Sequence, residues 1–274
     1  MGLRSVRGLC LLPSRPPPRH GAHCRRRGPG GADHISSLSD DMILLILARL
    51  GCVRTAVRTG LLSRRWRGVW TRLTDLTFCG VMPTVIKAAL TRFEAASSAG
   101  AVSFLDIRLP LNPKPGDAQS LLSAVAQLSP AELVFTFPQS SLWEKREDPF
   151  TDIHLPCFHR ATSIDLDMPH FIVRVPPAGE FPVLERLSVS GAIVEIGSLV
   201  TRCPRLRVLR AKFRGLVPKS VALALGSLKA ALHSRQVAVS LLLDICVSEL
   251  NYSLVHSATE LSPEEFVYRS CAKR

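Results

Sequence analysis

The stretch FPVLERLSVSGAIVEIGSLVTRCPRLRVLRA, residues 181–211, contains one short apolar pattern twice. In the first copy, Leu187 and Val189 alternate with polar residues, which is typical of a β-strand with one buried face. The pattern begins again after 22 residues, so that Leu209 repeats the position of Leu187. The stretch therefore predicts two strands with similar surroundings.

The same pattern precedes this stretch in residues 105–109, 133–137 and 164–168. Ile164 lies 23 residues before Leu187, and the earlier intervals are nearer 28 to 30 residues. Such intervals are in the range of a leucine-rich-repeat solenoid, in which each strand buries its apolar residues against the next turn. We therefore predict strands alternating with helical or irregular connections, and Leu199 and Val200 suit one returning helix.

The segment DHISSLSDDMILLILARL, residues 33–50, carries the signals of a helix start. Ser39 is a good N-cap residue, and Asp40 and Asp41 fall in the first turn, where carboxylates favour the positive end of the helix dipole. Gly51 closes the segment. Five apolar side chains recur at helical spacing on one broad face: Met42, Ile43, Ile46, Leu47 and Leu50.

Two further helices are predicted, one over residues 53–61 and one that begins at Ser63. A single apolar stripe would follow the latter through Leu62, Trp66, Val69, Trp70 and Leu73. The arginines of this segment lie off the stripe: Arg64, Arg65, Arg67 and Arg72. Because the tryptophans belong to the stripe, we interpret them as core anchors. A helix-turn-helix that places these arginines in the major groove of DNA stays open as an alternative.

Three helices totalling about forty residues form a bundle too small to bury all of its apolar surface. The first helix is apolar over a wider arc than such a bundle requires. Surplus apolar surface on a small helical module indicates an interface with a partner.

The segments DHISSLSDDMILLILARL and AVRTGLLSRRWRGVW together resemble the plant F-box motif over residues 33–74. The strand patterns and the dipeptide Cys203-Pro204 resemble the repeats that follow the F-box in plant F-box/leucine-rich-repeat proteins. The resemblance implies an α+β fold, with a small three-helix F-box followed by a short leucine-rich-repeat solenoid. It also implies a non-catalytic subunit of a cullin-based ubiquitin ligase of the Skp-cullin-F-box type. Such a subunit docks a Skp-type adaptor, and through it a cullin, and holds a target protein with its repeats.

Carried over to this chain, the adaptor contacts of the family fall on Leu38, Ile43, Ile46, Leu47, Leu50 and Trp66. Ser39 and Gly51 stand where the family usually has proline, which pre-sets the chain entering and leaving the helix. An F-box-like scaffold outside the ligase is therefore kept as an alternative. The family usually continues through more repeats and a further C-terminal domain, so we expect a truncated or divergent member.

We expect four regions: a disordered basic arm in 1–32, an F-box in 33–75, leucine-rich repeats in 81–215 and an irregular, partly helical segment in 216–274. In the last region one helical face would carry Ala222, Leu225, Leu228 and Leu232. A terminal helix is predicted to begin at Ser262.

The net charge of +13 is unevenly distributed along the chain. Residues 1–32 carry seven arginines and no acid, whereas residues 33–80 net only +3. A basic nucleic-acid-binding protein stays open as an alternative function. The eight cysteines form no C-x-x-C pair, and we expect neither a secretory signal nor a membrane span. We expect an intracellular protein of the nucleus or cytoplasm, and organelle targeting by the arm stays open as an alternative.

The sequence contains none of the glycine-rich nucleotide-binding motifs and no G-x-S-x-G motif, so we expect no catalytic residue and no cofactor. His154, Cys157 and His159 are spaced like metal ligands, with His170 as a conceivable fourth. We interpret them as a core cysteine flanked by loop histidines, with no metal. The acidic stretch in 143–152 is interpreted as a solvated loop.

Basic and apolar residues alternate in TRCPRLRVLRAKFR, residues 201–214. On a strand this alternation would direct several cations to one side and form a site for an acidic peptide or a phosphate. The expected target-binding residues are Arg205, Arg207, Arg210 and Lys212. In the alternative interpretation, they only keep the surface of a solenoid solvated.

Overall fold

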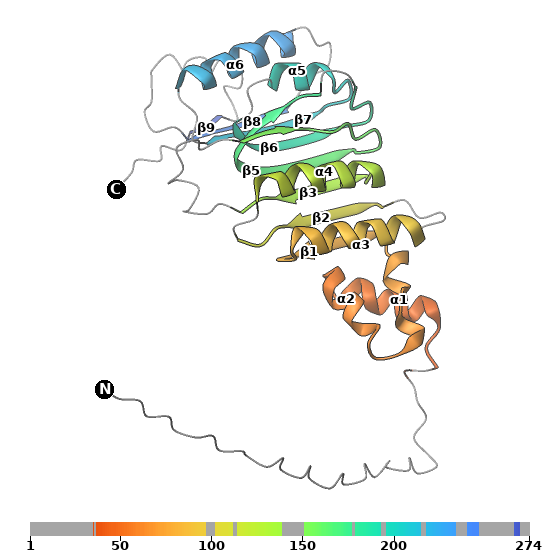
Figure 1. Ribbon diagram of the computed structural model, residues 1–274. Coiled ribbons are helices and arrows are strands. Elements are labelled where there is room, and N and C mark those ends of the chain that lie inside the picture. Colours follow the sequence, from red (N-terminus) through yellow and green to blue (C-terminus); the bar gives the residue numbers. More distant parts are fainter. Residues whose placement is uncertain are drawn as a thin grey trace, which may run out of the picture. The chain divides into compact units, whose positions relative to one another are not determined.

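The computed structural model describes residues 35, 37–96, 102–111, 114–138, 151–176, 179–192, 196–214, 218–233, 240–246 and 266–268. The chain divides into two compact units, Met1–Leu38 and Ser39–Arg274. The second unit contains all the helices and strands described below (Figure 1). Helix and strand are mixed in it, which confirms the predicted α+β class.

Four short helices form the helical module at the start of the second unit. They are α1 (Asp40–Arg49), α2 (Val53–Thr59) and the 3-10 helices η1 (Arg64–Trp66) and η2 (Val69–Arg72). The Ser39 hydroxyl accepts a hydrogen bond from the Met42 amide at 3.3 Å, which confirms the predicted N-cap. Gly51 has a φ of 65°, a left-handed conformation that glycine adopts without steric cost. The predicted end of the first helix is thereby confirmed.

Nine strands of the described residues form one parallel sheet. Eight follow the order β1-β2-β3-β5-β6-β7-β8-β9, and β4 pairs with β5 beside β3. Their bounds are β1 Asp75–Cys79, β2 Phe104–Arg108, β3 Glu132–Thr136, β4 Thr151–His154, β5 Ser163–Arg174, β6 Arg186–Ala192, β7 Val208–Arg214, β8 Ser240–Cys246 and β9 Phe266–Tyr268. Apart from β4, neighbours in the sheet are therefore also neighbours along the chain.

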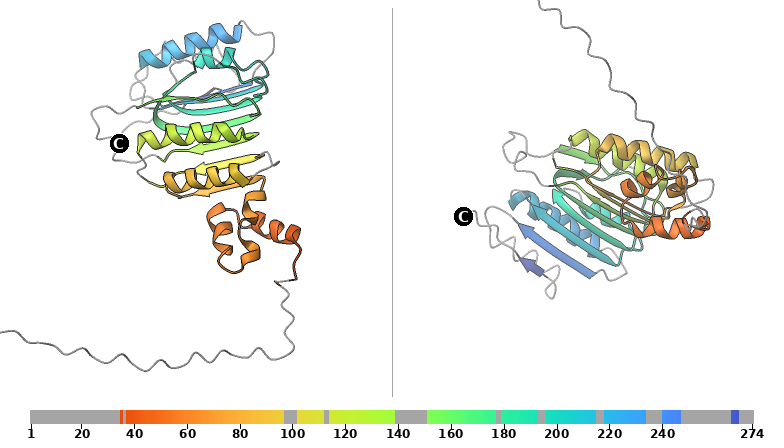
Figure 2. Two further views of the ribbon diagram at one scale, coloured as in Figure 1. Left: turned by 45° about the vertical axis from the view of Figure 1, so that its right-hand side comes forward. Right: turned by 90° about the horizontal axis from the view of Figure 1, so that it is seen from below.

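Longer helices connect several of these strands: α3 (Pro83–Ala96), α4 (Pro115–Leu128), α5 (Ile196–Thr201) and α6 (Pro218–His233). Helix α3 packs on α4 along the β1 to β3 end of the sheet, and α5 packs on α6 at its other end (Figures 1 and 2). Leu225 and Leu228 are buried, as the predicted face of α6 requires, and the predicted helix at Leu199 and Val200 is present as α5.

The strands pair so that equivalent apolar residues stand next to one another. Leu105 pairs with Leu133, which pairs with Ile164, and the row continues through Leu187 to Leu209. All five side chains are buried. The intervals of 22 and 23 residues read from the sequence thus correspond to direct neighbours in the sheet.

The prediction of a continuous third α-helix is wrong. Gly68, with a φ of 79°, separates η1 from η2. Ser63 still caps the segment, because its hydroxyl accepts a hydrogen bond from the Arg65 amide at 3.3 Å. Trp66 and Trp70 are buried as predicted, but Leu62 is 79% exposed because the helical period does not extend back to it.

The sheet extends on both sides of the range in which strands were predicted. Strand β1 precedes residue 81, and β8 and β9 follow residue 215. Phe266–Tyr268 form a strand where a terminal helix was predicted, and residues 262–265 lie outside the described part of the chain.

Among the described residues, no helix is long and apolar enough to cross a membrane.

Two glycines provide a matched test of how closely α5 and α6 pack. A Cβ at Gly197 would overlap the backbone carbonyl of Ser227 in α6, whereas a Cβ at Gly226 would meet no atom within 4 Å. We expect Gly197→Ala to lower the free energy of unfolding by about 1–3 kcal/mol. Gly226→Ala should raise it by about 0.5–1 kcal/mol, because alanine is the better helix former. Urea unfolding measures both, and equal effects would contradict this packing.

Candidate functional site

The exposed face of α1 is strongly apolar. Ile43 and Leu47 point into the helical module and are buried, while Met42, Leu45 and Ile46 are 48%, 60% and 37% exposed. Exposed side chains of this size on one short helix are unusual unless a partner covers them. We call Met42, Leu45 and Ile46 the α1 surface.

The turn that follows α2 adds two further exposed leucines. Leu61 is 82% exposed and Leu62 nearly as much, and Val57 of α2 is also partly exposed. None of these side chains is needed to fill the core of the module, which is made by Ile43, Ala56 and Trp70 among others. The helical module therefore presents more apolar surface than its own fold requires.

The residues predicted to contact an adaptor divide into two groups. Ile43, Leu47 and Trp66 are buried within the described structure, whereas Ile46 is exposed. Leu38 and Leu50 are half-buried. Sequence reasoning missed Leu45 and did not include Met42, because a helix that is apolar nearly all round does not reveal which side faces inward.

Three of the four arginines in the third segment bind within the helical module. Arg65 donates from Nε and a terminal nitrogen to the Asp40 carboxylate at 3.1 and 2.9 Å. Arg72 pairs with Asp41 at 3.7 Å. Arg67 donates to the Gly60 carbonyl at 3.2 Å. These contacts tie the start of α1 and the end of α2 to η1 and η2, and they occupy the groups that a DNA-reading helix would need free.

The predicted target-binding cations lie at one part of the sheet. Arg205 and Arg207 are exposed in the turn before β7, and Arg210 and Lys212 follow on the strand itself. Leu209 and Ala211, which alternate with them, are buried. Arg210 and Lys212 therefore share the face of the sheet opposite to the apolar core, as the alternation predicts.

The same face carries an ion pair near the first strand. The Asp106 carboxylate is buried and pairs with Arg108 at 2.8 Å. The hydrogen bond to Asp106, and then its charge, raise the pKa of Arg108 above the ordinary value. Partial desolvation, followed by the proximity of Cys52, raises the pKa of the Cys79 thiol, which is exposed and lies beside Arg108 in the sheet.

The described residues bring no three metal-ligating side chains together. His154 lies at the end of β4, where its backbone pairs with the Gln119 side chain at 2.7 and 3.0 Å. Cys157 and His159 follow in the loop, and the side chain of His170 lies outside the described part. Residues 143–150 of the predicted acidic loop also lie outside it. The loop prediction is wrong at its end, because Thr151 and Asp152 belong to β4, where Asp152 pairs with Arg174 at 3.3 Å.

The chain shares a short region with one known plant protein. Over 46 residues it is 46% identical to an F-box protein of Arabidopsis thaliana. The match covers 17% of this chain and 9% of that protein, so it supports a relationship over an F-box-sized segment and does not extend to the remainder of either protein. No family model matches the chain, and no solved structure matches it.

Leu62 and Leu73 test which part of the predicted stripe belongs to the core. Leu73 is 7% exposed, whereas Leu62 projects into solvent. Leu73→Ala should lower the free energy of unfolding by about 2–5 kcal/mol, because it leaves a cavity. Leu62→Ala should change it by less than about 0.5 kcal/mol. Chemical unfolding followed by tryptophan fluorescence separates the two, and a large loss in Leu62→Ala would contradict the broken third segment.

Proposed function

We propose that this chain is the non-catalytic target-recognition subunit of a Skp-cullin-F-box ubiquitin ligase. The observation that carries the proposal is the shared F-box-sized segment, together with the exposed apolar residues of the helical module. In this proposal residues 33–75 are the F-box and dock a Skp-type adaptor, which joins the chain to a cullin. The sheet region holds the target.

The α1 surface supports docking by apolar contact. Met42, Leu45 and Ile46 lie on α1, and Leu61 and Leu62 follow α2. Burying such side chains contributes about 25 cal/mol for each Å² removed from water. In this arrangement Ile43, Leu47 and Trp66 do not contact the adaptor. They are buried in the helical module and hold its helices in the geometry that exposes the α1 surface.

The strand region supports a leucine-rich-repeat solenoid. Equivalent residues such as Ile164, Leu187 and Leu209 stand in register along a parallel sheet, and helices return between several strands. In such a solenoid each unit buries its apolar residues against the next. The outward face of the strands is then free to carry side chains for a partner, and there Arg210 and Lys212 lie.

Catalysis in such a complex needs no reactive group in this chain. One part binds the adaptor, and another holds a target near the ubiquitin-conjugating enzyme. The lysines of the target then react because their effective concentration is high.

The contacts of Arg65, Arg67 and Arg72 favour this function over nucleic-acid binding, because those side chains already serve the fold. An apolar docking face should also tolerate salt, whereas binding through phosphate contacts weakens steeply as salt rises.

Adaptor binding is tested with paired substitutions of exposed residues. We expect the full chain to co-purify with a plant Skp-type adaptor, and Leu45→Asp with Ile46→Asp to reduce recovery at least about tenfold, because two charges would be desolvated at the interface. The matched control is Leu111→Asp with Leu223→Asp, since both leucines are exposed elsewhere. It should bind like the parent. Circular dichroism confirms that each variant is folded.

Absence of binding by a well-folded parent would contradict the ligase-subunit proposal and favour the scaffold alternative, in which Ser39 and Gly51 replace the usual prolines. Unchanged binding of the Leu45→Asp, Ile46→Asp variant would instead place the docking face elsewhere, and equal losses in both double variants would show a general effect of the added negative charge. Repeating the binding between about 50 and 500 mM salt separates apolar docking from phosphate-like contacts.

Target binding is tested separately from adaptor binding. We propose that Arg205, Arg207, Arg210 and Lys212 contribute to the target surface. Arg207→Glu with Arg210→Glu should keep adaptor recovery and lose ubiquitination of proteins that the parent modifies in a reconstituted ligase, because an acidic or phosphorylated segment would be repelled. Lys87→Glu with Arg160→Glu, both at exposed positions outside the patch and outside residues 33–75, is the control. Unchanged ubiquitination in the first variant would exclude this surface.

A further inference from the structure

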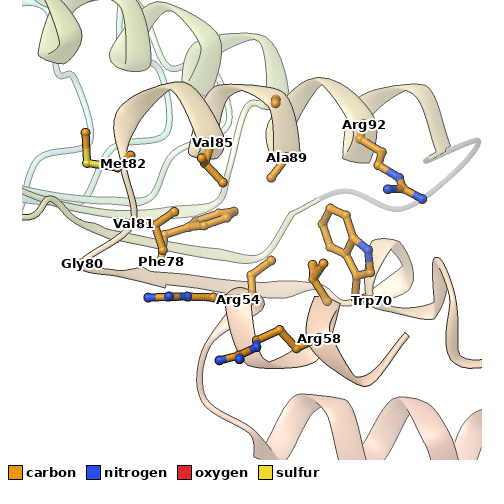
Figure 3. Close-up of a pocket in the computed structure, with 13 residues that line it drawn as sticks. Arg54, Arg58, Trp70, Phe78, Gly80, Val81, Met82, Val85, Ala89 and Arg92 are labelled. Carbon is orange, nitrogen blue, oxygen red and sulfur yellow. The ribbon is translucent and has the colours of Figure 1, made fainter. Parts of the chain in front are cut away.

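An apolar cleft lies where the helical module meets the sheet. Val57 on α2 lines one wall, and Val85 and Ala89 on α3 line the other (Figure 3). Trp70 and Phe78 lie at its base, and both are almost fully buried. The cleft has a volume of about 490 Å³. Cavities of this size and apolar character are typical of sites for small molecules.

The walls of the cleft are held apart by packed groups. The Trp70 ring packs against Phe93 of α3 with centroids 6.5 Å apart, which fixes η2 against that helix. Ala88 and Ala89 present only methyl groups toward the space beside α2. No larger side chain in the described part of the chain fills the gap, so the cleft follows from the sequence of α3 and from the position of Trp70.

Three arginines line the rim of this apolar space. Arg54 and Arg58 project from α2 on one side, and Arg92 projects from α3 near Trp70 at the opposite end (Figure 3). Of the residues that the structure describes, no acidic one lines the cleft. Among the described residues, none of these three guanidinium groups forms a salt bridge or a hydrogen bond. Because Arg54 and Arg58 are four residues apart on one helix, they also repel each other, and a bound anion would relieve that repulsion.

We propose that the cleft binds a small amphipathic anion, with its apolar body between α2 and α3 and its carboxylate or phosphate held by arginine at the rim of the cleft. Guanidinium groups are well suited to these anions because they donate paired hydrogen bonds. Charge excludes the N-terminal arm of the chain as the occupant, since residues 1–32 carry seven arginines and no acid. This inference does not rest on the ligase proposal.

Isothermal titration of the full chain with four compounds that share one apolar body tests the proposal. They are 4-phenylbutanoate, 4-phenylbutyl phosphate, the uncharged 4-phenylbutanol and the cationic 4-phenylbutylamine. We expect at least one anion to bind at least about tenfold more tightly than the alcohol, with the amine weakest. The tighter of the two anions identifies the favoured headgroup. Equal affinity of alcohol and anions, or no binding of any compound at millimolar concentration, would overturn the proposal.

Substitution of the three arginines locates the site. Arg54→Gln, Arg58→Gln and Arg92→Gln together should remove the preference for the anions and lower their affinity at least about tenfold. Ala89→Leu should weaken all compounds, because its side chain enters the cleft. Thermal unfolding of each variant shows whether the fold is retained. An anion affinity that survives both sets of substitutions would overturn the assignment to this cleft.

A second triple variant controls for net charge. Arg49→Gln, Arg64→Gln and Arg160→Gln remove the same number of charges from exposed positions that do not line the cleft. This variant should bind the anions like the parent. An equal loss in the two triple variants would show a general attraction to a basic protein and would overturn the proposal. Binding of an acidic peptide without binding of the small anions would overturn it in favour of a peptide site.

Discussion

The stacking of buried apolar residues from strand to strand is the interaction on which the rest of the structure depends. Strands β1, β2 and β3 have only five residues each, and a strand of that length buries little by itself. Leu105, Leu133 and Ile164 each lie between a neighbour on either side, so their burial is shared. The cooperativity of such an array comes from these interfaces between units.

The helical module is connected to this array through its core and not through a linker. Strand β1 begins three residues after η2 ends, and α2 contacts β1. The contact of Trp70 with Phe93 continues the core into α3. An adaptor bound to the α1 surface would therefore be held at a defined position relative to the sheet, which a ligase subunit needs if proximity is its means of action.

Five of the strands, β2, β3, β5, β6 and β7, were predictable because alternation and spacing are local features of a sequence, whereas β1, β4, β8 and β9 were not predicted. The first helix was equally accessible, since Ser39, its acidic first turn and Gly51 act on the nearest backbone. The third segment was not, because Gly68 could stand within a weak helix or interrupt one, and only packing of the two tryptophans decides. For the same reason the sequence does not show that Leu62 leaves the stripe.

The candidate site required contacts between distant residues. A helix such as α1, apolar on several sides, can be buried along any of them, and the choice of Ile43 and Leu47 as the inner side depends on the segments that pack against it. The Asp40–Arg65 ion pair joins residues that are 25 positions apart, so the local sequence around either residue does not predict it. The cleft is less predictable still. Ala88 and Ala89 indicate an open space only once α2 is known to lie opposite them.

The arginines of the helical module show how one residue type is divided between fold and surface. Arg65, Arg67 and Arg72 hold helix ends together, and each has an oxygen partner within the module. Arg54 and Arg58 lie on α2 beside an apolar space, and neither forms a salt bridge with an acid among the described residues. Net charge therefore says little about the partner, because it counts both groups alike. Position distinguishes them, since an arginine that already neutralises a helix start contributes little field outside, whereas an unpaired one beside a low-dielectric wall attracts anions strongly.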